Sequence, residues 1–166
     1  MSKGPTILKV SGIVMIFQAV IGFVLFALNG LSVIIVLNKM KHRTDELLSK
    51  LSSFESIIDF IMVGLIFLTS IALLVCALKS LNTYNYYDIP GGNNKYLVPN
   101  KIALVIGAVS FIMDLVVLIV SESALGTAVL SLLSSSGWIL ALLNLILVKK
   151  DRAERAKEEP QKAWRF

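Results

Sequence analysis

The stretch "KIALVIGAVSFIMDLVVLIV", residues 101–120, decides the fold class of this chain. After Lys101 it contains a single charged side chain, that of Asp114, among apolar and small residues. An α-helix rises about 1.5 Å per residue, so about 20 such residues are needed to cross the hydrocarbon core of a bilayer. The stretch therefore predicts a transmembrane helix that carries one carboxyl group inside it.

Three further apolar stretches, residues 10–37, 56–78 and 124–148, predict three more spans. The whole chain is 56% hydrophobic and 16% charged, whereas soluble proteins are about 45–50% apolar and about 25% charged. The first stretch is too long for the apolar region of a secretory signal peptide, so we expect a retained helix. We predict an all-α, polytopic integral membrane protein, with a four-helix transmembrane domain over residues 1–148 and a charged cytoplasmic tail over 149–166.

The distribution of basic residues predicts the orientation. Four spans place both termini on one side of the membrane, and 12 of the 16 Lys and Arg residues fall on that side. Because cytoplasmic loops are enriched in Lys and Arg, we expect both termini to be cytoplasmic and the chain to lie in the plasma membrane. The loop over residues 38–55, which carries four basic residues, is the one feature against this orientation.

The two longer loops and the tail offer surfaces to a partner. In the loop over residues 38–55, apolar residues at helical spacing predict a short amphipathic helix or a prolongation of the second span. The loop over residues 80–100 contains all four tyrosines around a turn cluster, and predicts a hairpin or an irregular loop. Tyrosine is enriched at membrane interfaces and at protein interfaces, so either role fits. The candidates for partner binding are Tyr84, Tyr86, Tyr87 and Tyr96 in this loop, and Trp164 and Phe166 in the tail.

Small and polar residues recur at a spacing of three and four along each span. In lipid, helices associate through small residues and side-chain hydrogen bonds, so each such seam should face the other helices. Four seams at a mean spacing near 3.5 residues predict an antiparallel four-helix bundle with a left-handed crossing. The seams are Ser11, Met15, Gln18, Gly22, Leu25, Asn29 and Ser32 in the first span; Glu55, Asp59, Met62, Ile66, Thr69, Leu73 and Cys76 in the second; Ala103, Gly107, Ser110, Asp114, Val117 and Ser121 in the third; and Thr127, Ser131, Ser134, Gly137, Ala141 and Asn144 in the fourth.

The alternating directions of the spans place several of these polar residues at common depths. Counting helical rise from the side of the termini, Asn29, Asp59 and Asp114 fall in the far half of the membrane. Gln18 and Asn144 fall in the near half. The sequence thus predicts an outer polar layer of the first three residues and an inner layer of the other two.

Asp114 is the residue that most needs an explanation. A charge near the bilayer centre costs on the order of 3 kcal/mol, and the spans offer no Lys or Arg beyond Lys101 at the start of the third. One interpretation is a neutral carboxyl group hydrogen-bonded to Asn29 or to Ser and Thr hydroxyls. A second is a cation or proton site shared with Asp59, and a third is contact with a partner subunit.

Enzymatic activity is not expected. The only histidine, His42, lies in a polar loop, and the only cysteine, Cys76, lies inside a span, so the sequence offers no catalytic triad, no zinc cluster and no phosphate-binding glycine loop. We expect no cofactor, no metal and no nucleic-acid partner. The predicted function is that of a small non-catalytic membrane protein that associates with or helps assemble a larger membrane complex. The alternative is a small transporter or channel-like protein that binds a cation or proton at Asp114 and Asp59.

Overall fold

The structure is a computed structural model, and it describes residues 4–40, 54–85, 96–120 and 125–163. All of the regular structure in this part of the chain is helical. The helices are α1 (Gly4–Met40), α3 (Phe54–Asn85), α4 (Leu97–Val120), α5 (Leu125–Ser135) and α6 (Gly137–Ala163). The predicted amphipathic helix in the loop over residues 38–55 and the predicted hairpin around Pro90 lie outside the described residues.

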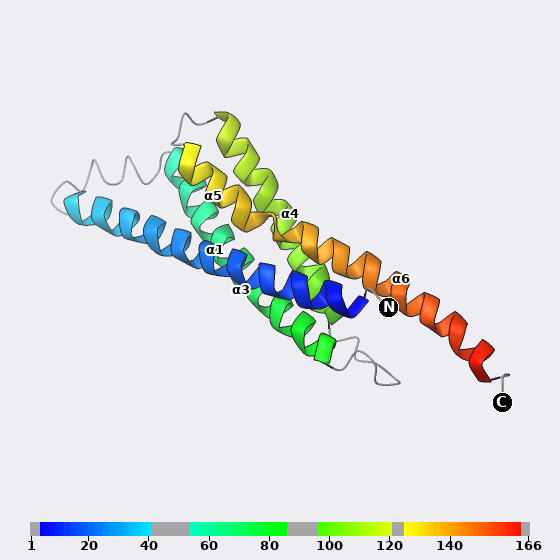
Figure 1. Cartoon of the computed structure of the whole chain (residues 1–166). Coiled ribbons are helices and arrows are strands. Elements are labelled where there is room, and N and C mark those ends of the chain that lie inside the picture. Colours follow the sequence, from blue (N-terminus) through cyan, green and yellow to red (C-terminus); the bar gives the residue numbers. More distant parts are fainter. Residues whose placement is uncertain (1–3, 41–53, 86–95, 121–124, 164–166) are drawn as a thin grey trace.

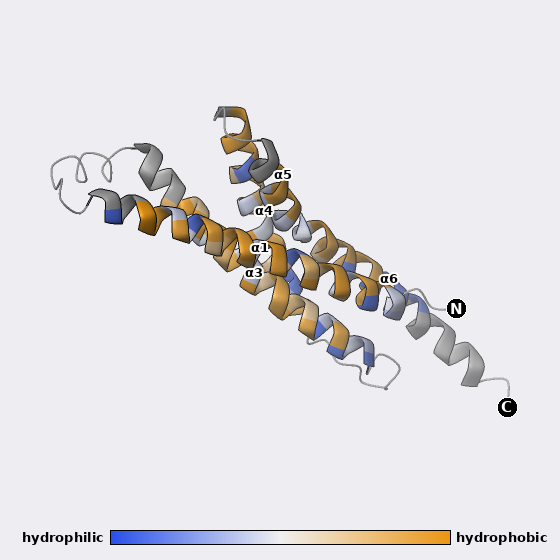
Figure 2. Cartoon of the chain, turned by 60° about the vertical axis from the view of Figure 1, so that its left-hand side comes forward, coloured by the Kyte–Doolittle hydropathy of each residue, from blue (hydrophilic) through white to orange (hydrophobic). Residues whose placement is uncertain are grey.

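Four helical segments are long and apolar enough to cross a membrane, as predicted. They run over Gly4–Ile35, Phe60–Asn85, Leu97–Ile119 and Val129–Glu154. Figure 2 shows that apolar residues dominate the middle of these helices and that hydrophilic residues gather toward their ends. The chain is therefore all-helical, with the composition of a multi-pass membrane protein.

The helices pack on one another in the middle of the molecule. α1 packs on α3, α3 packs on α4, and α4 packs on α6, while α6 also contacts α1. α5 contacts both α1 and α4, and Figure 1 shows it between them. Both chain termini lie at one end of the molecule in Figure 1, which we call the termini end. At the opposite end lie the last residues of α1 and α4 and the first residues of α3 and α5.

Small residues let the helices approach closely. The largest buried apolar cluster contains Met15, Ala19, Leu73, Cys76, Ala77, Ala103 and Ala141, four of which are alanines. Glycine serves the same purpose at Gly22, where a Cβ would collide with the hydroxyl groups of Ser70 and Ser134. Because lipid tails are as apolar as leucine, close packing of this kind holds membrane helices together better than burial of large side chains does.

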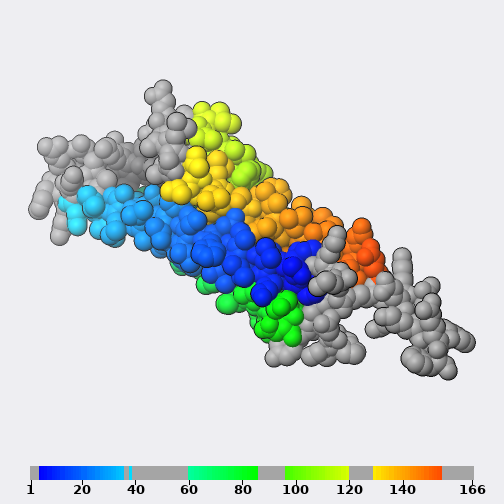
Figure 3. All heavy atoms as spheres, viewed as in Figure 1, coloured from blue at the N-terminus to red at the C-terminus, as the bar shows by residue number. Residues whose placement is uncertain are grey.

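Large apolar side chains point outward. Ile119 is 82% exposed and Phe17 is 66% exposed, and many other Val, Leu, Ile and Phe side chains are also exposed. Figure 3 shows the face of the molecule on which α1 lies, with α5 and α6 along its flank. A soluble protein rarely leaves so much apolar surface in water, so this surface suits a hydrocarbon surrounding.

The fourth apolar stretch is not one helix. α5 ends at Ser135 and α6 begins at Gly137, so the single span predicted over residues 124–148 is interrupted at Ser136. The amide of Ser136 still donates to the carbonyl of Leu132 at 2.9 Å, and the amide of Ile139 donates to the carbonyl of Ser136 at 3.0 Å. We refer to residues 134–137 as the helix break.

The predicted seams are largely buried. In the third span Ala103, Ser110 and Asp114 are buried, and in the first span burial continues as far as Leu25. The prediction for the rest of the first seam is wrong, because Asn29 and Ser32 are exposed. The reason is that α1 continues beyond the helices that cover it, as its far end in Figure 1 shows.

Candidate functional site

Two groups of buried polar side chains lie among the helices. The first joins α1, α3, α4 and α6 near the termini end, and consists of Ser11, Ser80, Asn100 and Asn144. We call it the four-helix amide network. Ser11 donates to Asn144 Oδ1 at 2.7 Å, and Asn144 Nδ2 donates to Asn100 Oδ1 at 3.1 Å.

The remaining hydrogen bonds of the network are accepted by Ser80 and by the backbone. Nδ2 of Asn144 and Nδ2 of Asn100 each lie 3.4 Å from the hydroxyl of Ser80, and Asn100 also donates to the carbonyl of Tyr96 at 2.7 Å. The four side chains are at most 4% exposed, and none of them has a buried polar atom without a partner. Each of the four helices thus supplies a side chain that hydrogen-bonds to another helix, and these bonds fix the register of the helices relative to one another.

Aromatic and basic residues lie beside the network at the termini end. Tyr96 is buried with Leu8 and Val148, and the guanidinium carbon of Arg152 lies 5.3 Å from the centre of its ring. Lys9 Nζ lies 5.4 Å from the ring centre of Tyr84. Distances of this size are typical of cation–π contacts, so two of the predicted partner-binding tyrosines are engaged within the chain.

Sequence reasoning missed Asn100 and Ser80, although the signal was present. Asn100 stands three residues before Ala103, and Ser80 stands four residues after Cys76, so both continue the predicted seams by one step. The sequence predicts a loop over residues 80–100, which leaves both residues outside the spans, whereas α3 extends to Asn85 and α4 begins at Leu97.

Gln18 lies at the helix break, away from Asn144. Its Nε2 donates to the carbonyl of Leu133 at 3.1 Å and to the hydroxyl of Ser136 at 3.0 Å. Ser134 in turn donates to the carbonyl of Gln18 at 3.3 Å. Gln18 of α1 thus donates hydrogen bonds to polar groups at the end of α5. An interrupted helix in lipid requires such partners for the groups that it leaves unpaired. The two residues of the predicted inner layer therefore belong to different groups.

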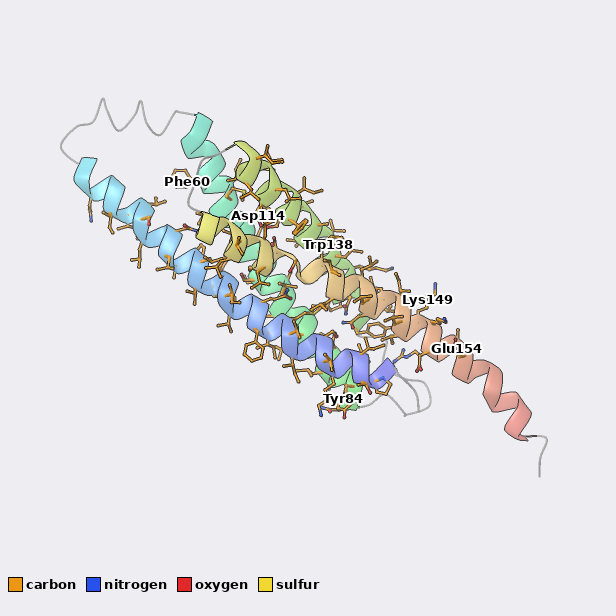
Figure 4. All side chains as sticks on the ribbon, turned by 45° about the horizontal axis from the view of Figure 1, so that its top comes forward. Phe60, Tyr84, Asp114, Trp138, Lys149 and Glu154 are labelled. Carbon is orange, nitrogen blue, oxygen red and sulfur yellow. The ribbon has the colours of Figure 1, made fainter. Side chains whose placement is uncertain are left out.

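The second polar group lies on the opposite side of α5, against α4. Its centre is Asp114, which is 4% exposed and accepts a hydrogen bond of 2.7 Å from Ser131 at Oδ1. The hydroxyl of Ser135 also lies beside the carboxyl group. Figure 4 shows Asp114 between α4 and α5, near the helix break. With Ser110, one turn earlier on α4, these residues form what we call the Asp114 site.

The Asp114 site differs from the amide network in its pairing. Oδ2 of Asp114 and the hydroxyl oxygen of Ser110 are buried and have no hydrogen-bond partner among the described residues. Buried polar atoms are rarely left in this state, because each costs about 1–3 kcal/mol when it loses its water. On the other side of α5, the Oε1 atom of Gln18 is also buried and has no hydrogen-bond partner among the described residues.

The remaining predicted site residues do not join this group in the described structure. Asn29 is exposed on α1, whereas Asp114 is buried between α4 and α5. Asp59 belongs to α3, but its side chain lies outside the described part, as do Tyr86, Tyr87, Trp164 and Phe166. Over the ranges that the structure describes, no group of three His, Cys, Asp or Glu side chains is placed to hold a metal ion.

Comparison with known proteins gives no match. No protein-family model, no curated protein and no solved structure matches this chain. Its function must therefore be argued from its own geometry. That geometry offers a tightly paired network that holds four helices and a buried carboxyl group with unpaired oxygen atoms beside it.

Proposed function

We propose that this chain is a small non-catalytic protein of the plasma membrane that docks on, and helps to assemble, a larger membrane complex. In this proposal its helices form an antiparallel bundle with both termini in the cytoplasm. The observation that supports it best is the course of α6. Among the residues of α6 whose exposure is described, which end at 154, Val148 is the last fully buried one, yet the helix continues to Ala163, about 22 Å further.

The projecting part of α6 has the composition of a contact surface for protein. Figure 1 shows it extending past the ends of the other helices. Residues 149–163 contain six basic and four acidic side chains, and the charged residues 149–152 are consecutive. Charge on all sides of a helix is unsuited to the lipid surface. A segment of this length is only marginally helical in water, so a protein partner would stabilise it.

Co-purification tests the docking role. The full chain, tagged at its N-terminus, would be extracted from its native membrane in a mild detergent, and its companions would be identified by mass spectrometry. The proposal expects a larger membrane protein in stoichiometric amount. It is wrong if the chain elutes alone or only as copies of itself at the lowest detergent concentration that keeps it soluble.

A pair of truncations locates the contact. Removing residues 155–166 deletes the outer part of α6 but keeps Arg152 beside Tyr96, so we expect the partner to be lost while the unfolding midpoint is unchanged. Removing only residues 164–166 is the matched control and should retain the partner. If this shorter deletion already releases the partner, Trp164 and Phe166 form the contact and the proposed role of the helix is wrong.

The proposed topology can be measured separately. Single cysteines placed at Lys95 and Lys150, in a chain whose own Cys76 is replaced by alanine, should both react with a membrane-impermeant reagent only after the cytoplasmic face is opened. Reaction of either position in intact cells contradicts the proposed orientation.

A second candidate function is favoured by the buried carboxyl group. A transporter or channel-like protein that binds a cation or a proton at Asp114, with or without Asp59, would require such a group inside the membrane. Flux into liposomes that is abolished by Asp114→Asn supports this candidate. Flux that is equal in empty liposomes excludes it.

A further inference from the structure

The carboxyl group of Asp114 has no positive counterpart among the described residues. It lies six residues before the end of α4 at Val120, inside the apolar span, and is almost completely buried. A buried carboxylate is normally paired with a cation or hydrogen-bonded at both oxygens. Here one oxygen is bonded to Ser131, and the other has no hydrogen-bond partner within the described part of the chain.

The oxygen atoms around this position come from two facing pairs. Ser110 and Asp114 are four residues apart on α4, and Ser131 and Ser135 are four residues apart on α5. Residues at this spacing lie next to each other on one helix face. The hydrogen bond from Ser131 to Asp114 sets the two pairs opposite each other. The carboxyl group and the three hydroxyl-bearing residues thus lie on facing sides of the contact between α4 and α5.

Protonation alone does not account for this arrangement. A neutral Asp114 would remove the charge but would bring no partner to the buried hydroxyl of Ser110, which has none among the described residues. A small cation between the two helices would satisfy the charge, Oδ2 of Asp114 and the hydroxyl of Ser110 at once. Carboxylate and hydroxyl oxygens are ligands suited to hard cations rather than to soft transition metals.

From this geometry we propose that the Asp114 site binds one sodium ion, held by Asp114 and the hydroxyls of Ser110, Ser131 and Ser135. A monovalent ion matches the single carboxylate, whereas a divalent ion would leave a net positive charge in the apolar span. The site lies between α4 and α5, apart from the projecting end of α6, so sodium binding and the docking role proposed for α6 stand or fall separately.

Sodium binding predicts a stability that depends on sodium at constant ionic strength. The full chain in detergent would be unfolded by heat in sodium chloride and in choline chloride of equal concentration. A ligand that binds only the folded state at about 100 times its Kd lowers the unfolding equilibrium constant about 100-fold. We expect the wild type to show a saturable effect of this kind, and radioactive sodium to bind once per chain.

Variants separate the site from general effects of salt. Asp114→Asn should abolish both sodium responses, and Ser110→Ala should weaken them while leaving the fold intact, which keeps the test valid if Asp114→Asn does not fold. Ser80→Ala, in the amide network, is the matched control and should retain the full response. Equal stability in sodium and choline overturns the proposal. So does stability that changes with pH but not with sodium, which would show proton binding only.

Discussion

The four-helix amide network and the Asp114 site are both buried and polar, but they differ in how completely they are paired. In the network, every side-chain polar atom has a partner, and the bonds link four helices. At the Asp114 site, two helices meet and two oxygen atoms have no partner in the part of the chain that the structure describes. Complete pairing fixes a structure, whereas incomplete pairing leaves atoms that can bind something else.

The first test of this difference is to break the network. Asn144→Leu keeps the approximate volume of the side chain but leaves Ser11, Ser80 and Asn100 without one of their partners. We expect a loss of about 3 kcal/mol in the free energy of unfolding, measured by denaturation in mixed micelles. Asn29→Leu is the matched control, because Asn29 is exposed, and should change stability by less than about 0.5 kcal/mol. Equal effects of the two variants would show that the network does not hold the helices.

The second test shifts α5 relative to α4 without changing the oxygen atoms of the Asp114 site. Gly22→Val on α1 would push against Ser70 and Ser134, and so would displace α5. We expect a loss of about 2 kcal/mol, as for other overpacked positions, together with a loss of the sodium response.

The control for this substitution is Gly64→Val. A Cβ at Gly64 meets nothing within 4 Å, so this variant should retain both the stability and the sodium response of the wild type. If Gly22→Val is as stable as Gly64→Val, α5 is free to move away from α1, and the close approach at Gly22 is not required.

The spans could be predicted from the sequence because their signal is local. Length and apolar composition indicate a membrane helix, and the spacing of small residues indicates its buried face. Extending that spacing by one step would also have identified Asn100 and Ser80. The helix break could not be predicted in this way, since serine and glycine also occur in continuous membrane helices. The polar groups of the helix break accept hydrogen bonds from Gln18, which stands 115 residues before Leu133 and 118 residues before Ser136.

The same limit applies to Asp114. The sequence predicts that the carboxyl group needs a hydroxyl or amide partner, but Ser131 and Asn29 are equally good candidates until the register of α5 is known. The structure brings Ser131 to the carboxyl group and leaves Asn29 exposed. Contacts between distant spans therefore need the three-dimensional arrangement, even where the residue types are correctly selected.

A third test concerns Tyr96, which borders the network before the apolar span of α4. Burial raises the pKa of its phenol above the ordinary value, and the nearby Arg152 opposes this to a smaller extent. The unfolded chain loses this proton near pH 10. The neutral phenol thus makes its full contribution to the free energy of unfolding below about pH 10, and this contribution is lost as the pH rises through the raised pKa. Tyr96→Phe should make the free energy of unfolding less sensitive to alkaline pH.

The measurement for Tyr96 is denaturation in mixed micelles at a series of alkaline pH values. Tyr84→Phe, at a half-buried tyrosine of α3, is the matched control. Parallel loss of stability in the wild type and in Tyr96→Phe would show that the phenol is not buried against the network.

The smallest expected effect is the one that best distinguishes the two polar groups. Ser80→Ala removes a hydroxyl that accepts two hydrogen bonds, so it should cost about 1 kcal/mol whether or not sodium is present. Ser110→Ala removes a hydroxyl that has no partner among the residues described, so in sodium-free buffer it should change the free energy of unfolding by less than about 0.5 kcal/mol, or slightly raise it. In sodium it should become less stable than the wild type. If Ser110→Ala costs as much as Ser80→Ala in both buffers, Ser110 is a structural residue, and the contrast between a paired network and an open site no longer holds.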